Sequence, residues 1–416
     1  MSSVQETVNR ILNDVKREGV SQILAYTKKF DGIELEAEQI VVDVDTLPLP
    51  TWPSHAQEAF KIKEAIDFAC EQIRCFHETT LPQKTISFDP VSGLHLEERL
   101  IPLERVGIYV PNGQYPLISS LLMTAIPAQV AGVQELVAAI APKAPLTLDP
   151  LWIYALKAAR VKTVLRIGGA QAIAAMAYGF EGFNPVELIA GPGNQFVAEA
   201  KAEVFRRGIA GLDVIAGPSE VLVLAGHLDT FEAETAALDL LAQAEHAPDT
   251  HAYFVSWNQN SVSQVQNRVK EWTKESDRPL GPIDWMSVSN PQEALMLANR
   301  IAPEHMGLMG AEAQTLAPSV KTAGALFIGR MAGQALGDYV AGPSHVLPTG
   351  GTGRFLGGLG TRTFMRRMSV IAADDRLPRE YLEAGQILAQ LEGLKFHEQS
   401  LKTRLQQKTS REDYRP

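Results

Sequence analysis

Cysteine is scarce in this chain of 416 residues. The only two cysteines, Cys70 and Cys75, lie five positions apart in a segment with helical periodicity. That spacing matches neither a CxxC redox pair nor a zinc ribbon. Any metal that the protein binds must therefore be held by histidine, carboxylate or amide side chains.

Long apolar runs and an excess of positive charge are also missing. The opening residues, MSSVQETVNRILNDV, contain no apolar signal core, and no later stretch has the apolar length of a membrane span. We therefore expect a cytoplasmic protein. The net charge of −10 argues against a surface for duplex nucleic acid, because neutralising phosphates requires a concentrated face of lysine and arginine.

The glycine fingerprints of nucleotide binding are absent too. The glycine-rich strings IGGAQAIAAMAYG (residues 167–179) and GGTGRFLGG (residues 350–358) lack the GxGxxG spacing, and no Walker A motif occurs. The residue pattern alone leaves dinucleotide binding open.

The chain does contain the composition and periodicity of a globular α/β protein, with 45% hydrophobic and 21% charged residues. Its length predicts two domains with extensions. Apolar residues at three-and-four spacing predict helices over residues 8–20 and 55–73, and again over 378–405. Between these helical ends, short apolar runs, most of which stop at glycine or proline, predict open, largely parallel sheets with functional loops at the carboxyl ends of strands. These runs are residues 105–111, 135–142, 161–169, 186–193, 212–219, 221–226, 251–256 and 325–329.

A glutamine and a histidine three positions apart end one predicted helix, in LAQAEHAP (residues 241–248). Asp229 and Glu232 can form its capping box, and Pro248 stops it after Gln243 and His246. The two side chains share a helix face and can bind one metal ion. An isolated pair of this kind is more often a solvated helix edge, or a charged histidine favoured by the helix C-terminus.

Three other segments carry residue types suited to catalysis. APEHMG contains the neighbours Glu304 and His305, which can act as general base and general acid, although the dipeptide alone also fits an exposed turn. The glycine-rich segment 335–355 carries Asp338 and His345 around one of three AGP turns, at 190–192, 216–218 and 341–343. A long glycine-rich loop with such residues favours function. His397 in LEGLKFHEQ reads alone as a surface histidine.

Taken together, the segments contain a possible nitrogen and oxygen ligand set for a metal, but no spacing rule joins residues so far apart. Their order, however, resembles that of the histidinol dehydrogenases. The resemblance extends over about residues 5 to 405 and rests on eight motifs: RVGIYVPNG, GGAQAIAAMAYG, AGPGNQFVAEAK, GLDVIAGPSEVLVLA, LLAQAEH, APEH, LGDYVAGPSHVLPTGG and EGLKFH.

The resemblance implies a role for each matching position. It assigns one zinc ion per subunit to Gln243, His246, Asp338 and His397, with His397 contributed by the other subunit of a homodimer. Glu304 and His305 take the catalytic acid and base positions. Substrate contacts fall on Ser219, His305 and Glu392 together with the four metal positions. NAD contacts fall on Tyr109, Gln171 and Asn194.

The resemblance also implies a fold and a reaction. The fold is α/β, with two incomplete Rossmann-like open sheets that lack the glycine fingerprint and with helical extensions at both ends. We assign residues 1–108 and 219–360 to a first α/β domain with the zinc and catalytic residues, 109–218 to a second on the NAD side, and 361–416 to an extension that reaches the partner's site. The reaction is the oxidation of L-histidinol to L-histidine with two NAD⁺.

Two positions depart from the family pattern: Asn112 in PNGQYP, where a second glycine is usual, and Ser344 in AGPSH, where asparagine is usual. Two alternatives therefore stay open. One is a related zinc- and NAD-dependent dehydrogenase of another small polar alcohol, such as a sulfopropanediol dehydrogenase. The other is a non-catalytic metal-binding scaffold, against which the Glu304–His305 pair argues.

Overall fold

The structure is a computed structural model that describes residues 3–49, 56–112, 116–143, 148–214, 217–274 and 279–412. The chain forms two compact units. The first comprises Met1–Leu81 and Leu103–Phe364, and the second comprises Pro82–Pro102 and Met365–Pro416.

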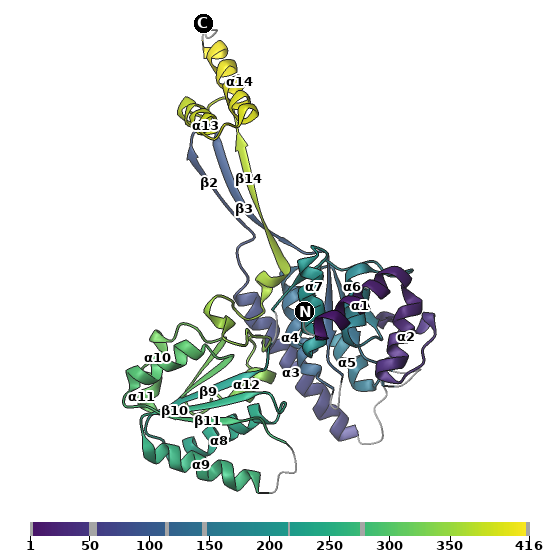
Figure 1. Ribbon diagram of the computed structural model, residues 1–416, viewed down its shortest axis with the longest axis vertical. Coiled ribbons are helices and arrows are strands. Elements are labelled where there is room, and N and C mark those ends of the chain that lie inside the picture. Colours follow the sequence, from purple (N-terminus) through teal and green to yellow (C-terminus); the bar gives the residue numbers. More distant parts are fainter. Residues whose placement is uncertain are drawn as a thin grey trace. The chain divides into compact units, whose positions relative to one another are not determined.

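A six-stranded sheet organises one half of the first unit (Figure 1). Its strand order is β1 (Val41–Asp43), β6 (Thr163–Leu165), β5 (Glu135–Ile140), β4 (Arg105–Val110), β7 (Leu188–Ala190) and β8 (Gly211–Leu212). All neighbouring strands are parallel except β1 and β6. Because the order reverses between β4 and β7, their carboxyl ends form the switch point at which open α/β sheets bind ligands.

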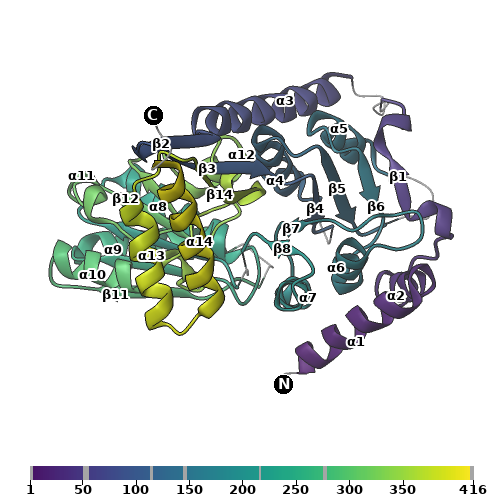
Figure 2. The same ribbon diagram turned by 90° about the horizontal axis from the view of Figure 1, so that it is seen from above.

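Helices cover both faces of this sheet (Figure 2). On one face lie α3 (Ala56–Thr79), α4 (Ile118–Ala131) and α5 (Pro150–Ala158). On the other lie α6 (Gly169–Tyr178) and α7 (Gln195–Arg206). The strands are apolar on both faces because both are covered; residues 106–110 of β4 are all buried.

The N-terminal helices α1 (Ser3–Glu18) and α2 (Val20–Asp31) pack on this same sheet. Val8, Leu12 and Ile23 are fully buried in one apolar cluster with residues of α6 and α7. This packing places residues 3–31 with the six-stranded sheet, whereas the sequence-based division grouped residues 1–108 with the other sheet. The amphipathic periodicity shows that a helix has an apolar face but carries no information about which sheet that face covers.

A five-stranded parallel sheet organises the other half, in the order β11 (Ile283–Ser287), β10 (His251–Ser256), β9 (Glu220–Ala225), β12 (His305–Met309) and β13 (Ala325–Ile328). Helices α8 (Thr230–Ala244) and α9 (Gln259–Thr273) cover one face. Helices α10 (Pro291–Ile301) and α11 (Ala311–Gln314) cover the other. Beyond β13 comes the short helix α12 (Gln334–Tyr339).

The second unit contains an antiparallel sheet in the order β14 (Met365–Ala373), β3 (Leu94–Pro102) and β2 (Thr85–Val91). It ends in a helical pair, α13 (Arg379–Leu391) and α14 (Lys395–Glu412). The C-terminal helix predicted over residues 378–405 is thus two helices, separated at Gly393, whose φ of 72° lies in the left-handed region that favours glycine.

The predicted α/β fold with two mainly parallel open sheets is confirmed. No helix in the described part of the chain combines the length and the apolar character needed to span a lipid bilayer.

Candidate active site

Six of the residues predicted for the site line one cavity of about 240 Å³ in the first unit. They are Ser219, Gln243, His246, Glu304, His305 and Asp338. The fold thus brings together side chains from segments separated by more than a hundred positions in the chain.

These residues gather at the amino-terminal edge of the five-stranded sheet. Ser219 immediately precedes β9, and His305 is the first residue of β12, opposite Val221 in the parallel register. The expectation that functional loops follow the carboxyl ends of strands does not hold for these side chains. A helix between two parallel strands runs back to the amino end of the second strand, so the last turn of α8 reaches this edge as well.

The end of α8 fixes Gln243 and His246. Gln243 is fully buried, and its Oε1 accepts a hydrogen bond of 2.9 Å from Nε2 of Gln334. Its Nε2 has no hydrogen-bond partner among the described residues. In the turn after the helix, Nδ1 of His246 donates to the carbonyl of Ala242 at 2.7 Å, which leaves the lone pair on Nε2.

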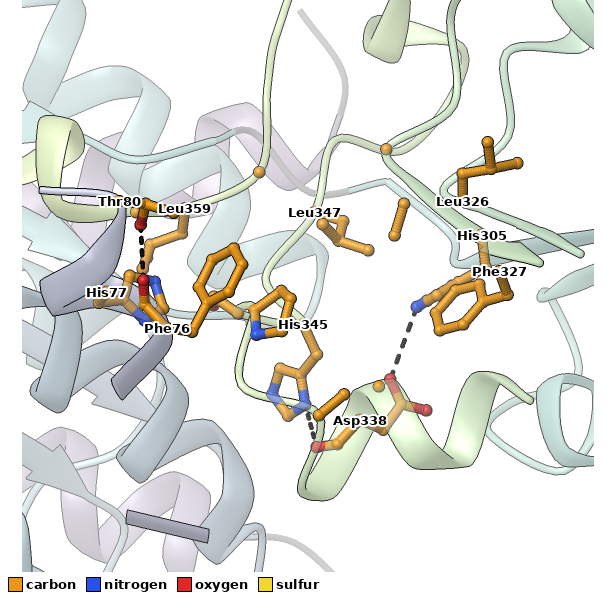
Figure 3. A pocket seen from close by; sticks show the side chains of 18 of the residues that line it. Phe76, His77, Thr80, His305, Leu326, Phe327, Asp338, His345, Leu347 and Leu359 are labelled. Carbon is orange, nitrogen blue, oxygen red and sulfur yellow. Dashed lines mark hydrogen bonds and ion pairs between the residues drawn. The ribbon is translucent and has the colours of Figure 1, made fainter. Parts of the chain in front are cut away.

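Asp338 lies on α12, with Oδ1 3.5 Å from Nε2 of His305 (Figure 3). Burial alone would raise the pKa of Asp338. The interaction with His305 and the nearby histidines 345 and 246 outweigh burial and hold that pKa below its usual value. The carboxylate is therefore maintained as an anion in a largely buried position.

No three His, Cys, Asp or Glu side chains in the described ranges are close enough to form a metal site by themselves. The predicted set nevertheless suits zinc chemically. It combines a carboxylate, an imidazole with a free lone pair and a buried amide, whose oxygen is the atom that can coordinate a metal. His246 also has the backbone hydrogen bond that usually orients a ligating histidine.

Glu304 and His305 form a buried acid–base pair. Glu304 is 6% exposed and His305 4% exposed, and Oε2 of Glu304 lies 3.7 Å from Nδ1 of His305. Burial raises the pKa of Glu304, whose Oε2 accepts from the backbone N–H of Glu220 at 3.1 Å. Burial would lower the pKa of His305, but the neighbouring Asp338 and Glu304 together raise it.

Several residues outside the predicted set contact the site residues or line their cavity. The buried Gln334 contacts Gln243, and His345 lines the cavity while its Nδ1 donates to the carbonyl of Asp338 at 2.8 Å. The sequence pattern indicated His345 only as part of a glycine-rich loop that favours function, and nothing in the sequence indicated Gln334. Ser344, one of the two departures from the family pattern, is buried and donates to the carbonyl of Met123 at 2.9 Å, so its hydroxyl ties the loop to α4.

His305 and His345 also line a second, larger cavity of about 610 Å³ (Figure 3). His305, Asp338 and His345 line it, and its other walls are largely apolar, with Phe76 and Phe327 among them. His305 therefore faces two neighbouring spaces, a smaller one lined by the predicted site residues and a larger, more apolar one.

The predicted NAD residues lie along the carboxyl edge of the six-stranded sheet. Tyr109, in β4, accepts from the backbone N–H of Gly169 at 3.1 Å, and Asn194 caps α7 after β7. At the switch point a Cβ on Gly191 would lie 2.2 Å from the carbonyl oxygen of Tyr109, so only glycine allows this close approach. Gln171 is buried in α6, and both of its amide atoms lack partners among the described residues.

The two sheets contribute to one cavity. Residues that follow β4 and β7 at the switch point, among them Ser120 and Gly193, line the same space as the six predicted site residues. The carboxyl edge of one sheet thus meets the amino edge of the other.

Glu392 and His397 belong to the second unit. Glu392 caps the end of α13, His397 lies in the first turn of α14, and both are exposed. Their assignment to the site remains a prediction. Of the loop PNGQYP, residues 113–115 lie outside the described residues.

Comparison with known proteins identifies the family of this chain. The family model described as histidinol dehydrogenase matches residues 1–405. The chain is 38% identical to the histidinol dehydrogenase of Gluconobacter oxydans, over 97% of this chain and 93% of that protein. It is 37% identical to the histidinol dehydrogenase of Aquifex aeolicus, with coverages of 96% and 92%. The chain belongs to the histidinol dehydrogenase family. The family resemblance seen in the sequence is thereby confirmed.

Solved structures agree. The crystal structure of histidinol dehydrogenase from Elizabethkingia anophelis has a TM-score of 0.88 at 28% identity, covering 98% of this chain and 93% of that one. Betaine aldehyde dehydrogenase from Staphylococcus aureus, at 11% identity and a TM-score of 0.52, covers 90% of this chain and 84% of its own and shares the fold alone.

Proposed function

We propose that this member of the histidinol dehydrogenase family oxidises L-histidinol to L-histidine through the aldehyde, with zinc bound and two NAD⁺ as hydride acceptors, as the last step of histidine biosynthesis. One observation carries the proposal. Three of the four candidate metal ligands, Gln243, His246 and Asp338, line a single cavity with the Glu304–His305 pair. The same cavity also receives the switch point of the other sheet.

Gln243, His246 and Asp338 would hold the zinc ion in the first unit, and the partner subunit's His397 would be the fourth ligand. When bound, zinc would hold the amino and imidazole nitrogens of the substrate and so fix its carbinol carbon for hydride transfer. The NAD⁺ would accept the hydride on the Tyr109 and Asn194 side of the cavity.

His305 is placed to move the alcohol proton. The carbonyl of Glu220 lies 3.4 Å from Nδ1 and can only accept, so it favours a proton on Nδ1; with Asp338, 3.5 Å from Nε2, engaged as a zinc ligand, Nε2 would carry the lone pair. Nε2 takes the hydroxyl proton as the first hydride leaves the carbinol carbon, and the product is the aldehyde.

Glu304 is placed for the hydration step. Its carboxyl group is buried with a raised pKa, so it accepts a proton more readily than an exposed carboxylate does and can later return that proton. It removes a proton from the water that adds to the aldehyde and so gives the hydrate. His305 then takes a hydroxyl proton of the hydrate as the second hydride leaves, and the carboxylic acid forms.

The homodimer is part of the proposal. Around Glu392 and His397, the described second unit exposes large apolar side chains: Leu388 is 61% exposed, Leu391 79% and Phe396 91%. Such a patch on the surface is typical of a docking site. A partner subunit is the occupant that would give these side chains and the two polar residues a common role.

NADH production from L-histidinol tests the proposal, with chelator-treated and zinc-restored protein as controls. We expect turnover that is lost on chelation and restored by zinc. His305→Asn should fold and bind zinc but lose about 100-fold to 10,000-fold in turnover, because it removes the base. His227→Asn, an exposed histidine outside the cavity, is the matched control and should behave as wild type.

Turnover with another small diol and none with L-histidinol would contradict the proposed substrate. Absence of turnover with any alcohol, from protein shown to bind zinc, would contradict the enzymatic role. The wild-type gene should let a histidine auxotroph grow without added histidine, and the His305→Asn gene should not. That result would support the same reaction in the cell.

A further inference from the structure

Buried polar atoms without partners gather where β4, β5 and β6 end. Asp31 Oδ2, Asn112 Oδ1 and both amide atoms of Gln171 are inaccessible to solvent and make no hydrogen bond among the described residues. A buried polar atom in a native protein normally has a partner, so a cluster of such atoms indicates a bound molecule.

Glycines bring these atoms to one place. Gly168 follows β6, and a Cβ there would lie 3.4 Å from Oδ1 of Asp31 and 2.7 Å from Cβ of Ala141, which follows β5. At the next residue, a Cβ on Gly169 would lie 2.7 Å from Oε1 of Gln171. A Cβ at either position would collide with these neighbours, so only glycine at the start of α6 lets the polar groups approach one another this closely.

The amide of Asn112 is held in position. Its Nδ2 donates to the carbonyl of Ala141 at 2.8 Å, which leaves Oδ1 as an acceptor without a donor. Asp31 is the last residue of α2, and its Oδ2 is likewise a buried acceptor without a donor among the described residues. Burial raises the pKa of Asp31, as expected of a carboxyl group that lacks a donor. The cluster is therefore rich in acceptors and requires a ligand with several donors.

A vicinal diol meets this requirement, because its two hydroxyls can donate to a carboxylate and to an amide oxygen at once. A phosphate ester in the same place would put like charges together and remove a donor. The position also fits a nucleotide. It lies at the carboxyl edge of parallel strands, next to Tyr109, whose hydroxyl contacts Gly169.

We propose that Asp31 and Asn112 bind the two hydroxyls of the adenosine ribose of the dinucleotide and thereby select NAD over its 2′-phosphorylated form. This inference rests on the proposed function, since it places the same cofactor. It assigns a binding role to the N-terminal helical pair, which reaches the cofactor through the last residue of α2.

Direct binding of NADH and NADPH, followed by fluorescence titration at fixed ionic strength, tests the inference without turnover. We expect wild type to bind NADH more tightly than NADPH. Asp31→Asn should weaken NADH binding by about 10-fold to 100-fold, the loss expected for a hydrogen bond to a charged group, and should bring the two affinities together. Asn112→Ser should weaken NADH binding without favouring NADPH.

Glu34→Gln is the matched control. It removes the same charge three positions away, from a side chain that is 74% exposed and paired with Lys28. The melting temperature without ligand separates binding from structure, because Asp31→Asn removes a poorly solvated charge and should not lower it. A lower melting temperature together with unchanged affinity would assign Asp31 a structural role.

The outcomes distinguish the two proposals. If wild type binds neither nucleotide, the proposed function is wrong. If wild type binds NADH but Asp31→Asn keeps both its affinity and its discrimination, the inference is wrong and the proposed function stands. Equal weakening of NADH and NADPH would also overturn it, because the carboxylate would then not face the 2′ position.

Discussion

Asp239 is a mostly buried carboxyl group that the proposed reaction does not use. It lies one turn before Gln243 on the same face of α8 and accepts from the backbone N–H of Gln334. Burial, with the nearby charge of Asp338, raises its pKa from 3.8 to about 7. Asp239→Asn keeps the shape and the acceptor oxygen but removes the titration.

The size of the effect follows from proton linkage. Between pH 3.8 and about 7 the unfolded chain releases this proton while the folded chain keeps it, so rising pH destabilises the wild-type fold over this window. At about 1.4 kcal/mol for each pH unit, the full loss is about 4 kcal/mol, of which about 3 kcal/mol falls between pH 5 and pH 8. The Asn variant does not experience this loss.

Urea unfolding of chelator-treated protein measures the difference. The stability of Asp239→Asn relative to wild type should increase by about 3 kcal/mol from pH 5 to pH 8. The comparison cancels every other titrating group that the two proteins share. Asp249→Asn, which removes a carboxyl group from the exposed turn after the same helix, is the control variant.

A pH-independent difference between Asp239→Asn and wild type would refute the reasoning, because it would mean that Asp239 titrates alike in the folded and unfolded chain. Zinc adds a second check. A cation held by Gln243 and Asp338 would stabilise the ionised form of Asp239, so the trend should shrink when zinc is restored.

Three further predictions concern the same unit. Gln334→Leu removes the hydrogen bond that orients Gln243 and should lower zinc affinity about 10-fold to 100-fold in equilibrium dialysis; unchanged affinity would contradict it. Lys201→Met leaves Asp213 buried without its ion-pair partner and should cost about 3–5 kcal/mol in urea unfolding, much of which the double variant with Asp213→Leu should restore. Mixing inactive His397→Asn and Gln243→Ala chains should recover about one quarter of wild-type activity if subunits exchange randomly and share sites, and none if they do not.

The parts of this fold that could be predicted are those with a local signal. Strand β4 is an apolar run bounded by turn residues, and α8 has a capping box in which Asp229 and Glu232 bond reciprocally, so both could be located from neighbouring residues alone. The antiparallel sheet of the second unit has no such signal. Strand β2 is exposed along almost its whole length and lacks the alternation of a half-buried strand.

The residues of the candidate site also fall into those that the sequence could indicate and those that it could not. Gln243 and His246 could be named because the order of motifs matches a family, whereas their spacing fits any helix. Gln334 and Asp31 could not be named, because their importance comes from which atoms lie beside them. Gln334 contacts a residue 91 positions away, and Asp31 approaches a glycine turn in another part of the chain. Such pairings are set by tertiary packing.

The meeting of two opposite sheet edges gives the cavity its electrostatic character. Helices α6 and α7 begin at the carboxyl edge of the six-stranded sheet, and a helix N-terminus favours anions such as a pyrophosphate. Helix α8 ends at the amino edge of the five-stranded sheet, and a helix C-terminus favours cations. In the proposed function, the cofactor phosphates would bind at the first of these edges and the metal at the second, where Glu304 and His305 also lie. A protein with only one sheet would present a single kind of helix end at each edge and would need additional charged side chains to achieve the same separation.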